Sequence, residues 1–383
     1  MTDCYLPRLG GIEMHVRDLA ERQVAAGHDV TVVTSTRATD PGQRSGQVTV
    51  VRVDGSRTQP GRIGYRHSLL GRRVLGDGAF DVVHVHASTF SPLSFLAAHY
   101  AYHHRTPTVV TVHSLWAGAT PLFRVANLLT GWAAWPLEWS TVSEVAAAGL
   151  RRMVGPAPVA VVPDGVDSVA WRVTPLVRDR HELRLVAVGR LARRKRTLHL
   201  AKLLLDAQRR LPQGTRLTME IIGDGPERRR LERYLGHYGM DAWVRLRGAL
   251  SREEIRATFA RSDLYVAPAV LESFGIAALE ARCSGLPILA RAGTGIQDFL
   301  FHDVDGWLVD SDHAMADTIV DLAHERDRLN RVAAHNRSTD PGDTWPTVLR
   351  ACETLYQRAA TRHSRAWSVV AAADDTAVAV ASP

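Results

Sequence analysis

Short, continuous apolar runs recur along the whole chain, separated by stretches in which apolar residues follow helical spacing. In the first half, the runs occupy 28–35, 48–53, 81–87, 108–114 and a short 139–143. In the second half, they occupy 183–189, 217–223, 243–248, 264–269, 286–292 and 306–310. Strands that alternate with helices in this way predict an α/β fold with two doubly wound sheets, one in each half.

Helical spacing and its interruptions predict the domain organisation. Stretches with an apolar helical face occur at 12–26, 196–211 and 344–359. Periodicity fails and charges gather at 166–182, which predicts a linker. We therefore expect domains at 1–167 and 168–340, a final helix at 341–362 that crosses back onto the first domain, and a disordered tail at 363–383.

Composition narrows the class of protein. At 383 residues and 45% hydrophobic, the chain is longer than a single typical core requires. Its three cysteines lie far apart without a CxxC pair, which predicts a reducing, cytoplasmic compartment instead of a disulfide framework or a zinc site. The most apolar stretch, 125–137, is too short to cross a membrane and contains Pro136, so a core or interface helix is expected. The net charge of +7 comes from scattered basic residues without a recognition motif, so nucleic acid is not an expected partner.

Two cations follow one of the predicted strands. Gly189, Arg190 and Lys195 come directly after the apolar residues of 183–189, at the strand end where open α/β sheets bind ligands. Such a pair suits a diphosphate. Of the 47 Lys and Arg residues, only Lys195 and Lys202 are lysine. This rarity indicates that position 195 requires the compact point charge of lysine, and chance is the alternative.

Two carboxylates follow the strand predicted at 264–269. Glu272 and Glu280 flank or lie in a helix for which Ser273 is the expected N-cap and Gly285 the stop. Eight helical residues rise about 12 Å, which is too far for the paired carboxylates of a retaining glycosidase. The two glutamates therefore suit opposite ends of a long ligand, such as a sugar nucleotide. Two solvated glutamates on a surface helix are the alternative, which the nearby cations disfavour.

Five segments together resemble family 4 of the retaining glycosyltransferases, which have the GT-B fold. The segments are LPRLGGIEMHV at 6–16, VVPDGVD at 161–167, GRLARRK at 189–195, IIGDGPERRRLE at 221–232 and ESFGIAALEARCSGLPILA at 272–290. The resemblance covers nearly the whole chain, roughly 2–360. It implies two Rossmann-like domains facing across a cleft, an acceptor held by 1–167 and a nucleotide diphosphate sugar held by 168–340. We expect no cofactor and no metal.

The resemblance also implies roles for single residues. Glu272 would contact hydroxyls of the donor sugar, Glu280 the ribose, and Arg190 with Lys195 the diphosphate. His113 falls where the family places a histidine near the reacting sugar. Further substrate contacts are expected at Gly10, Gly11, Gly189, Ser273, Phe274 and Gly275. Asp164 stands where the family usually has asparagine.

The implied reaction moves a hexose from GDP-mannose or a UDP-sugar to a lipid or inositol-type acceptor, with retention. The cations and a helix N-terminus would stabilise the departing diphosphate, which would itself help to take the acceptor proton. A GT-B sugar-nucleotide epimerase and a non-catalytic sugar-nucleotide-binding descendant remain alternatives. A nicotinamide-dependent dehydrogenase is disfavoured because Gly223-Asp-Gly225-Pro lacks the third glycine of a dinucleotide turn.

Other polar residues have structural interpretations. Asp303-Val-Asp305 and Asp310-Ser-Asp312 resemble metal-binding pairs, but they flank the turn at Gly306, and no metal is expected there. His84 and His86 alternate along a strand end, so one is expected to face the ligand and at least one to be structural.

Two expectations concern the surface and the start of the chain. No acidic residue occurs from Gly55 to Gly76, where five arginines interleave with apolar residues. A helix at 57–75 would lie on an anionic membrane surface, which predicts peripheral association with the inner face of the membrane; a solvated helix is the alternative. We also expect the strand that normally precedes a glycine loop such as Gly10-Gly11 to lie upstream of Met1, about eight to ten residues earlier.

Overall fold

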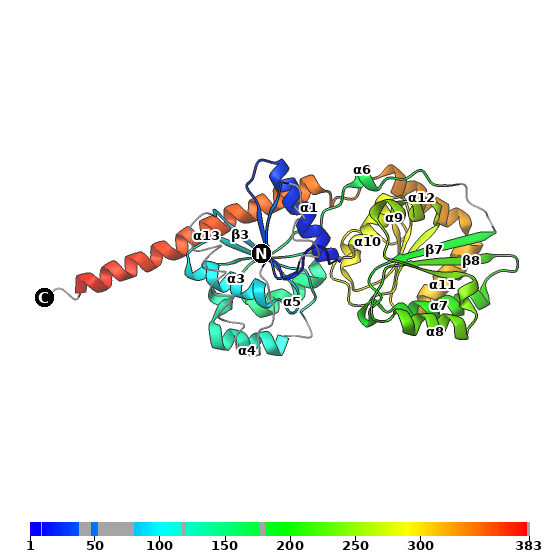
Figure 1. Cartoon of the computed structure of the whole chain (residues 1–383), viewed down its shortest axis with the longest axis horizontal. Coiled ribbons are helices and arrows are strands. Elements are labelled where there is room, and N and C mark those ends of the chain that lie inside the picture. The colour runs from blue at the N-terminus through cyan, green and yellow to red at the C-terminus, as the bar shows by residue number, and fades with distance from the viewer. Residues whose placement is uncertain (9, 38–46, 53–79, 117–119, 177–180, 381–383) are drawn as a thin grey trace. The chain divides into compact units, whose positions relative to one another are not determined.

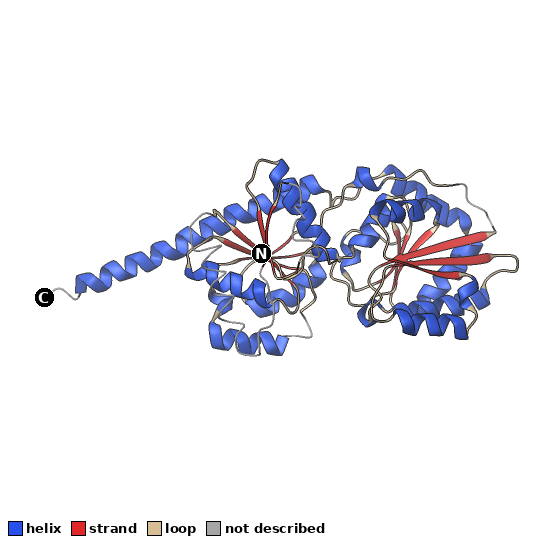
Figure 2. Cartoon of the chain, in the orientation of Figure 1, coloured by secondary structure: helices blue, strands red, loops and turns tan. Residues whose placement is uncertain are grey.

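The chain folds into two compact α/β units in the computed structural model. Unit 1 comprises Met1–Asp164 and Pro346–Pro383, and unit 2 comprises Gly165–Trp345. Parallel strands with helices on both faces form each unit (Figure 2). The structure describes residues 1–8, 10–37, 47–52, 80–116, 120–176 and 181–380. The basic segment 57–75 lies outside the described residues.

Unit 2 contains a six-stranded parallel sheet. Its strands are β7 Glu182–Val188, β8 Arg216–Ile222, β9 Val244–Gly248, β10 Leu264–Ala267, β11 Ile288–Arg291 and β12 Gly306–Val309. Their order is β12-β11-β10-β7-β8-β9, so the direction of winding changes between β7 and β10. The sequence predicted all six strands, and the doubly wound arrangement is confirmed.

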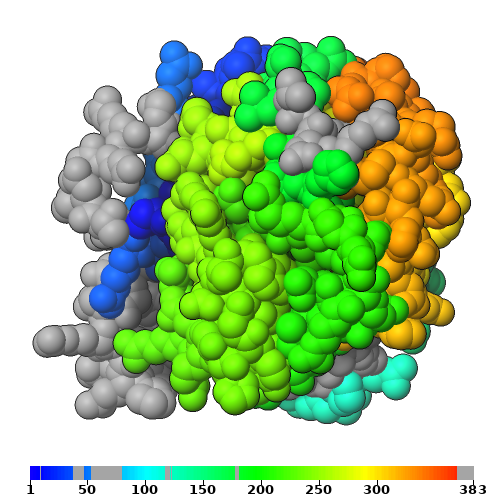
Figure 3. Space-filling model, turned by 90° about the vertical axis from the view of Figure 1, so that its right-hand side faces the viewer, coloured from blue at the N-terminus to red at the C-terminus, as the bar shows by residue number. Residues whose placement is uncertain are grey.

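Helices cover both faces of this sheet. One face carries α7 Thr197–Arg210, α8 Arg228–His237 and α11 Asp312–His324, and the other carries α9 Arg252–Arg261, α10 Ile276–Cys283 and α12 Arg326–Ser338 (Figure 1). Figure 3 shows α12, drawn in orange, beside green residues of the same unit, and Arg326 of α12 donates to the carbonyl of Glu182 at 2.8 Å. A short helix, α6 Ser168–Trp171, forms part of the predicted linker.

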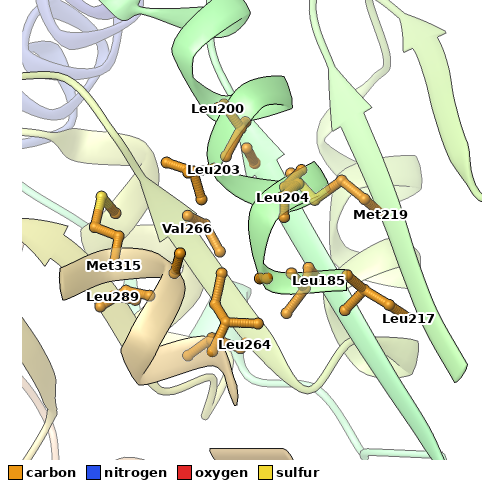
Figure 4. Packing of buried hydrophobic residues seen from close by; sticks show 14 of the residues in the cluster. Leu185, Leu200, Leu203, Leu204, Leu217, Met219, Leu264, Val266, Leu289 and Met315 are labelled. Carbon is orange, nitrogen blue, oxygen red and sulfur yellow. The ribbon is translucent and has the colours of Figure 1, made fainter. Parts of the chain in front are cut away.

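The core of unit 2 lies between the sheet and α7 and α11. Leucine and methionine side chains from these helices interdigitate with apolar side chains of β7, β8, β10 and β11 (Figure 4). Leu185, Leu204 and Leu264 are at most 1% exposed. Burying a leucine side chain contributes about 1.5–3 kcal/mol, so this packing fixes the strand positions that carry the loops of the site.

The sheet of unit 1 is built around the start of the chain. Its strands are β1 Thr31–Thr34, β2 Thr49–Arg52, β3 Val83–Ala87, β4 Thr108–Val112, β5 Glu138–Thr141 and β6 Val159–Val161. β3 to β6 pair in order, and β1 pairs with β2. Thr2 bridges β1 at Thr34 and β3 at His86, so the first residues lie between these two strands. The three-residue β6 was absent from the expected strands because so short a run has no distinctive pattern. The upstream strand stays a prediction.

Unit 1 has helices on both sides of its sheet and ends with a long helix. These are α1 Gly11–Ala25, α3 Pro92–His103, α4 Thr120–Thr130, α5 Glu144–Val154 and α13 Trp345–Val380. Arg362 of α13 lies 3.0 Å from the buried carboxylate of Glu138 on β5. The structure continues α13 through most of the stretch 363–383, where a disordered tail was expected. The alanine-rich sequence of this stretch explains the difference, because alanine has the highest helix propensity.

The apolar stretch 125–137 is not one core helix. α4 ends at Thr130, Gly131 adopts φ 63°, and a short 3-10 helix, η2 Trp132–Ala134, follows. Leu128 and Leu129 of α4 are 85% and 78% exposed. The core alternative is therefore wrong for the α4 part, whose buried contacts come from Phe123, at 6% exposure, and the interface alternative stays a prediction.

Candidate functional site

A pocket lies at the carboxyl ends of β7 and β10 in unit 2. The two strands are neighbours, with Leu185 paired to Leu264 and Val186 to Tyr265. Their following loops therefore meet, although they are distant in sequence. The pocket is lined by residues that include Gly189, Arg190, Lys195 and Glu272. This is the position where the winding of the sheet reverses, and such switch points bind ligands in open α/β sheets.

Lys195 and Glu272 form an ion pair across this pocket. The Nζ of Lys195 donates to Oε2 of Glu272, and the two side chains are 26% and 15% exposed. Lys195 ends a short 3-10 helix, η3 Arg193–Lys195, which is followed by Arg196 in the left-handed region at φ 57°. The ion pair holds the lysine and the carboxylate in place at the pocket wall. Arg190 lies on the same wall and is exposed.

Two glycines in the loop after β8 pack directly against the backbone of the loop after β7. A Cβ atom on Gly223 would lie 2.1 Å from the carbonyl oxygen of Gly189, and one on Gly225 would lie 2.5 Å from that of Leu191. Leu191 also donates its N–H to the carbonyl of Asp224 at 2.9 Å. Gly223 and Gly225 are therefore required for the close packing of these two loops. This packing explains both glycines of the Gly223-Asp-Gly225 motif, and no bound dinucleotide is needed to explain them.

Helix α10 begins at Ile276, later than the sequence indicated. Gly275 is its N-cap with φ 96°, and the expected cap by Ser273 is wrong. The left-handed backbone and the position of Ile296, 2.5 Å from where a Cβ would stand, require glycine at 275. The Phe274 ring is buried against Phe299, with centroids 5.3 Å apart. The first N–H groups of α10 have no acceptor within the helix, so this end suits an anionic ligand.

Tyr265 was missed by the sequence analysis. It lines the pocket, and its hydroxyl donates to the carbonyl of Val188 at 3.1 Å, directly before Gly189. Burial raises the pKa of Tyr265 far above its usual value, and the charges of Glu272 and Glu280 add to the effect. Both glutamates therefore act on the same region of the pocket edge. The one sign of Tyr265 in the sequence was that a polar aromatic residue interrupts an otherwise aliphatic strand.

The glycine loop of unit 1 leads directly into α1. Gly10 is the N-cap of α1, and Gly11 is its first residue. A Cβ on Gly10 would lie 2.4 Å from Oε2 of Glu13, whose other oxygen pairs with Arg8 at 2.8 Å. Glu13 is 3% exposed, so the loop is fixed by a buried carboxylate.

Three histidines and one aspartate gather at the carboxyl edge of the unit 1 sheet. His15 lies on α1, His86 on β3, His113 directly after β4 and Asp164 after β6. Oδ1 of Asp164 lies 3.1 Å from Nδ1 of His15 and 3.4 Å from Nδ1 of His113. Nδ1 of His86 lies 3.0 Å from Nε2 of His113. The sequence predicted His113 as a site residue, but it did not indicate this cluster.

His84 has a structural role, as expected for at least one of the two strand histidines. Its Nδ1 lies 2.9 Å from the hydroxyl of Tyr356 on α13, and its Nε2 lies 2.7 Å from the hydroxyl of Thr111. Gln23 of α1 donates to the same tyrosine at 2.7 Å. These bonds join α1, β3, β4 and α13.

Three of the four carboxylates in the two DxD-like motifs have arginine partners. Asp305 is 2% exposed and pairs with Arg282 at 2.7 Å, and Asp312 pairs with Arg291 at 2.9 Å. Asp303 pairs with Arg328. These contacts account for the carboxylates as structural ion pairs.

One group of side chains with metal-ligand chemistry occurs in the part of the chain that the structure describes. His15, His86 and His113 each offer a ring nitrogen, and these atoms lie within 4.8 Å of one another. An ion bound there would have to replace the contact between His86 and His113 and compete with the contacts to Asp164. We therefore interpret the cluster as a buried polar cluster, joined by the hydrogen bond between His86 and His113 and by the close contacts of His15 and His113 with Asp164.

Two family profiles match the chain almost end to end. The profile described as Glycosyltransferase Family 4 matches residues 9–169, and that described as Glycosyl transferases group 1 matches residues 175–339. The chain belongs to glycosyltransferase family 4. The resemblance found in the sequence is thereby confirmed. This glycosyltransferase is an enzyme, and both of its units match glycosyltransferase profiles.

Two relatives of this glycosyltransferase have names that contain phosphatidylinositol. The gpi3 subunit of phosphatidylinositol N-acetylglucosaminyltransferase from Schizosaccharomyces pombe is 26% identical, over 93% of this chain and 79% of its own. GDP-mannose-dependent alpha-(1-6)-phosphatidylinositol monomannoside mannosyltransferase from Mycobacterium tuberculosis is 26% identical, over 94% of this chain and 96% of its own.

Solved structures confirm the GT-B fold. A glycosyltransferase from Rickettsia africae superposes with a TM-score of 0.74 at 14% identity, over 93% of this chain and 97% of its own. HepE of Anabaena in complex with UDP and glucose superposes with a TM-score of 0.70 at 15% identity, over 96% of this chain and 98% of its own.

Proposed function

We propose that this glycosyltransferase moves a hexose, with retention, from GDP-mannose or a UDP-sugar to a lipid or inositol-type acceptor. The observation that carries the proposal is the convergence of Arg190, Lys195 and Glu272 on one pocket at the switch point of unit 2. The name of the Mycobacterium tuberculosis relative supports GDP-mannose, the UDP and glucose bound in the HepE structure support a UDP-sugar, and the names of both sequence relatives support a phosphatidylinositol-type acceptor.

The proposed donor site uses charge in two ways. Arg190 and Lys195 bind the diphosphate, and the start of α10 at Phe274 and Gly275 offers backbone N–H groups to the sugar. Glu272 accepts from sugar hydroxyls, and Glu280 accepts from the ribose. Because the ion pair already holds Lys195 and Glu272 in place, little side-chain ordering remains when the donor binds. Charge that develops on the departing diphosphate then meets cations already in position.

The proposed chemical step is a same-face substitution. The bond between the anomeric carbon and the phosphate oxygen breaks, and a bond from that carbon to the acceptor oxygen forms. The acceptor proton passes to the departing phosphate. Unit 1 supplies Gly10 and Gly11, where the backbone approaches a phosphate, and His113 beside the reacting sugar.

Proposed catalysis requires no metal, because Arg190, Lys195 and the α10 terminus supply the positive charge. Enzyme treated with EDTA and assayed in its presence should therefore keep its rate. A loss of activity that added Mg²⁺ or Mn²⁺ restores would contradict this part of the proposal.

We also propose that the enzyme acts at an anionic membrane surface. Among the described residues, no helix combines the length and apolar character that a bilayer crossing requires. α4 presents exposed Val125, Leu128 and Leu129 to solvent, beside exposed Arg124. The sequence contains no acidic residue between Asp81 and Glu138. An apolar helix face in an acid-free segment suits a lipid surface with anionic head groups.

The experiment that tests the function is a donor screen with product analysis. Purified enzyme is incubated with UDP-glucose, UDP-N-acetylglucosamine or GDP-mannose, with and without vesicles that contain phosphatidylinositol. We expect one donor to be consumed faster when the acceptor is present, and NMR of the product to show the anomeric configuration of the donor. Inverted product, or epimerised nucleotide sugar without transfer, would contradict the proposal.

A further inference from the structure

Asp164 lies between two histidines in the interior of unit 1. It follows β6, is 7% exposed, and presents the same oxygen, Oδ1, to Nδ1 of His15 at 3.1 Å and to Nδ1 of His113 at 3.4 Å. His15 and His113 are 4% and 5% exposed. Three separate elements therefore place one carboxylate oxygen between two imidazoles from which bulk water is largely excluded.

The chemistry of these groups restricts where their protons lie. Burial alone would raise the pKa of Asp164, but the rings of His15 and His113 lower it below the usual range, so the carboxylate stays ionised. Burial lowers the pKa of His15 to about 4, so this ring is neutral at pH 7 and has a single N–H. An ionised carboxylate only accepts hydrogen bonds. With Oδ1 of Asp164 at 3.1 Å from Nδ1 of His15 and 3.4 Å from Nδ1 of His113, the carboxylate favours a proton on the Nδ1 of each ring over one on Nε2.

The restriction passes from His113 to a third ring. Nδ1 of His86 lies 3.0 Å from Nε2 of His113, and one of these two nitrogens donates to the other. A His113 ring with its single proton on Nδ1 has an acceptor at Nε2, so in that tautomer Nδ1 of His86 is the donor. Burial, followed by the charge of His84, lowers the pKa of His86 well below its usual value, so this ring is also neutral and its Nε2 becomes an acceptor. One carboxylate thus sets the proton positions of three histidines.

We propose that Asp164 is a positioning residue for glycosyl transfer: it fixes the ring orientation and the Nδ1–H tautomer of His113, and through His113 those of His86. This inference rests on the proposed function, in which His113 is beside the reacting sugar. Because His113 is buried, a ring that cannot rotate or change tautomer holds the sheet edge around it in one geometry. A displacement of about 1 Å at a reacting group costs on the order of 100-fold in rate, so a fixed ring has a measurable effect.

The proton positions can be measured without any substrate. In protein labelled with ¹⁵N-histidine, long-range ¹H–¹⁵N spectra at pH 7 distinguish Nδ1–H from Nε2–H rings. The chain has 17 histidines, so His15, His86 and His113 are assigned from single substitutions. We expect Nδ1–H at all three. An Nε2–H ring at either His15 or His113 in the wild-type protein would overturn the proposal.

Two substitutions at Asp164 connect the tautomers to catalysis. Asp164→Leu keeps the branch at Cγ but is larger and has no acceptor, and we expect kcat to fall about 100-fold with less than a two-fold change in the donor KM. Asp164→Asn keeps a carbonyl acceptor, so it should retain the Nδ1–H rings and stay within about ten-fold of wild-type kcat. If Asp164→Leu does not fold, Asp164→Asn still tests the proposal. Changed histidine tautomers together with wild-type kcat in Asp164→Asn would overturn it. Folded Asp164→Leu with wild-type kcat would also overturn it.

Tyr356→Phe is the matched control. It removes a buried hydrogen bond to His84 in the same unit, and it leaves the contacts of Asp164 in place. We expect wild-type kcat and unchanged spectra for His15 and His113. A wild-type protein with the expected tautomers but no transferase activity would count against the proposed function and not against the proton positions.

Discussion

The carboxyl edges of the two sheets carry opposite kinds of chemistry. In unit 2 the edge has a cation and a carboxylate, Lys195 and Glu272, that are paired but remain 26% and 15% exposed. In unit 1 it has His15, His86, His113 and Asp164, all at most 7% exposed. The same type of topology therefore supports one site that can exchange a partner with a charged ligand and one buried cluster that holds imidazole rings in place.

Exposure explains the difference. A partly exposed ion pair contributes little to stability, so a diphosphate can compete for Lys195 at small cost. A buried carboxylate must keep all of its partners, because each lost hydrogen bond in an interior of low dielectric is costly. Unit 2 is thus suited to bind charge that arrives with a ligand, and unit 1 is suited to hold a fixed geometry.

The largest expected effect comes from loss of the charged side chains in the unit 2 pocket. Lys195→Ala, and likewise Arg190→Ala and Glu272→Ala, should lower kcat/KM by about 10²–10³, because each removes a preorganised electrostatic contact. Steady-state kinetics with the verified donor measures this. The control is Lys202→Ala, which removes the other lysine of the chain, an exposed residue on α7, and should be near wild type. Near-wild-type turnover in Lys195→Ala would refute its assigned role.

Acid should destabilise unit 1 before unit 2. The pKa of His15 is lowered from 6.5 to about 4, so between these values the unfolded state binds more protons than the folded state. Stability is then full above pH 6.5 and falls as pH drops toward 4, by about 3 kcal/mol for this group. The lowered pKa values of His84 and His86 act in the same direction.

Hydrogen exchange measured by mass spectrometry at pH 7 and pH 5 tests this, after correction for the intrinsic exchange rate. Peptides from β3 and β4 should lose protection, whereas those from β7 and β8 serve as the internal control. Equal loss in both units would show that the buried histidines do not set acid stability.

The proposed membrane surface belongs to unit 1 alone. Leu128→Glu should lower binding to vesicles with anionic lipid about ten-fold, because it places a negative charge on the apolar face of α4. Tyr238→Glu is the control, since it introduces the same charge at an exposed residue, 44% accessible, in unit 2. Sedimentation at low and high salt measures both. Identical losses for the two variants would remove α4 as the contact surface.

The smallest expected effect comes from removing the hydrogen bond that Tyr265 donates to the end of β7. Tyr265→Phe removes one hydrogen bond, from the hydroxyl to the carbonyl of Val188, which is worth about 1 kcal/mol. We expect kcat/KM to fall less than ten-fold, mostly through KM for the donor. A loss as large as that of Lys195→Ala would assign Tyr265 a direct role in the reaction.

Local patterns predicted most of the strands, the positions of Arg190, Lys195 and Glu272 after strands, and the glycine loop before α1. They failed where a contact outside the segment decides the outcome. Helix α10 starts at Ile276 and not near Ser273, because Ile296 packs against Gly275. For α4 the pattern left a core helix and an interface helix open, because an apolar sequence does not record whether the rest of the domain covers it, and the structure leaves Leu128 and Leu129 exposed.

The sequence by itself determined the family, the α/β class and the residue types that suit a nucleotide sugar. These properties depend on periodicity and on short motifs, which are local. Only the tertiary structure decided that β7 lies beside β10, so that Lys195 meets Glu272. It also decided that four separate elements bring together one buried cluster, which consists of Asp164, His15, His113 and His86. The physical reason is that strand order and side-chain packing are set by the core as a whole, and no local run of residues specifies its distant neighbours.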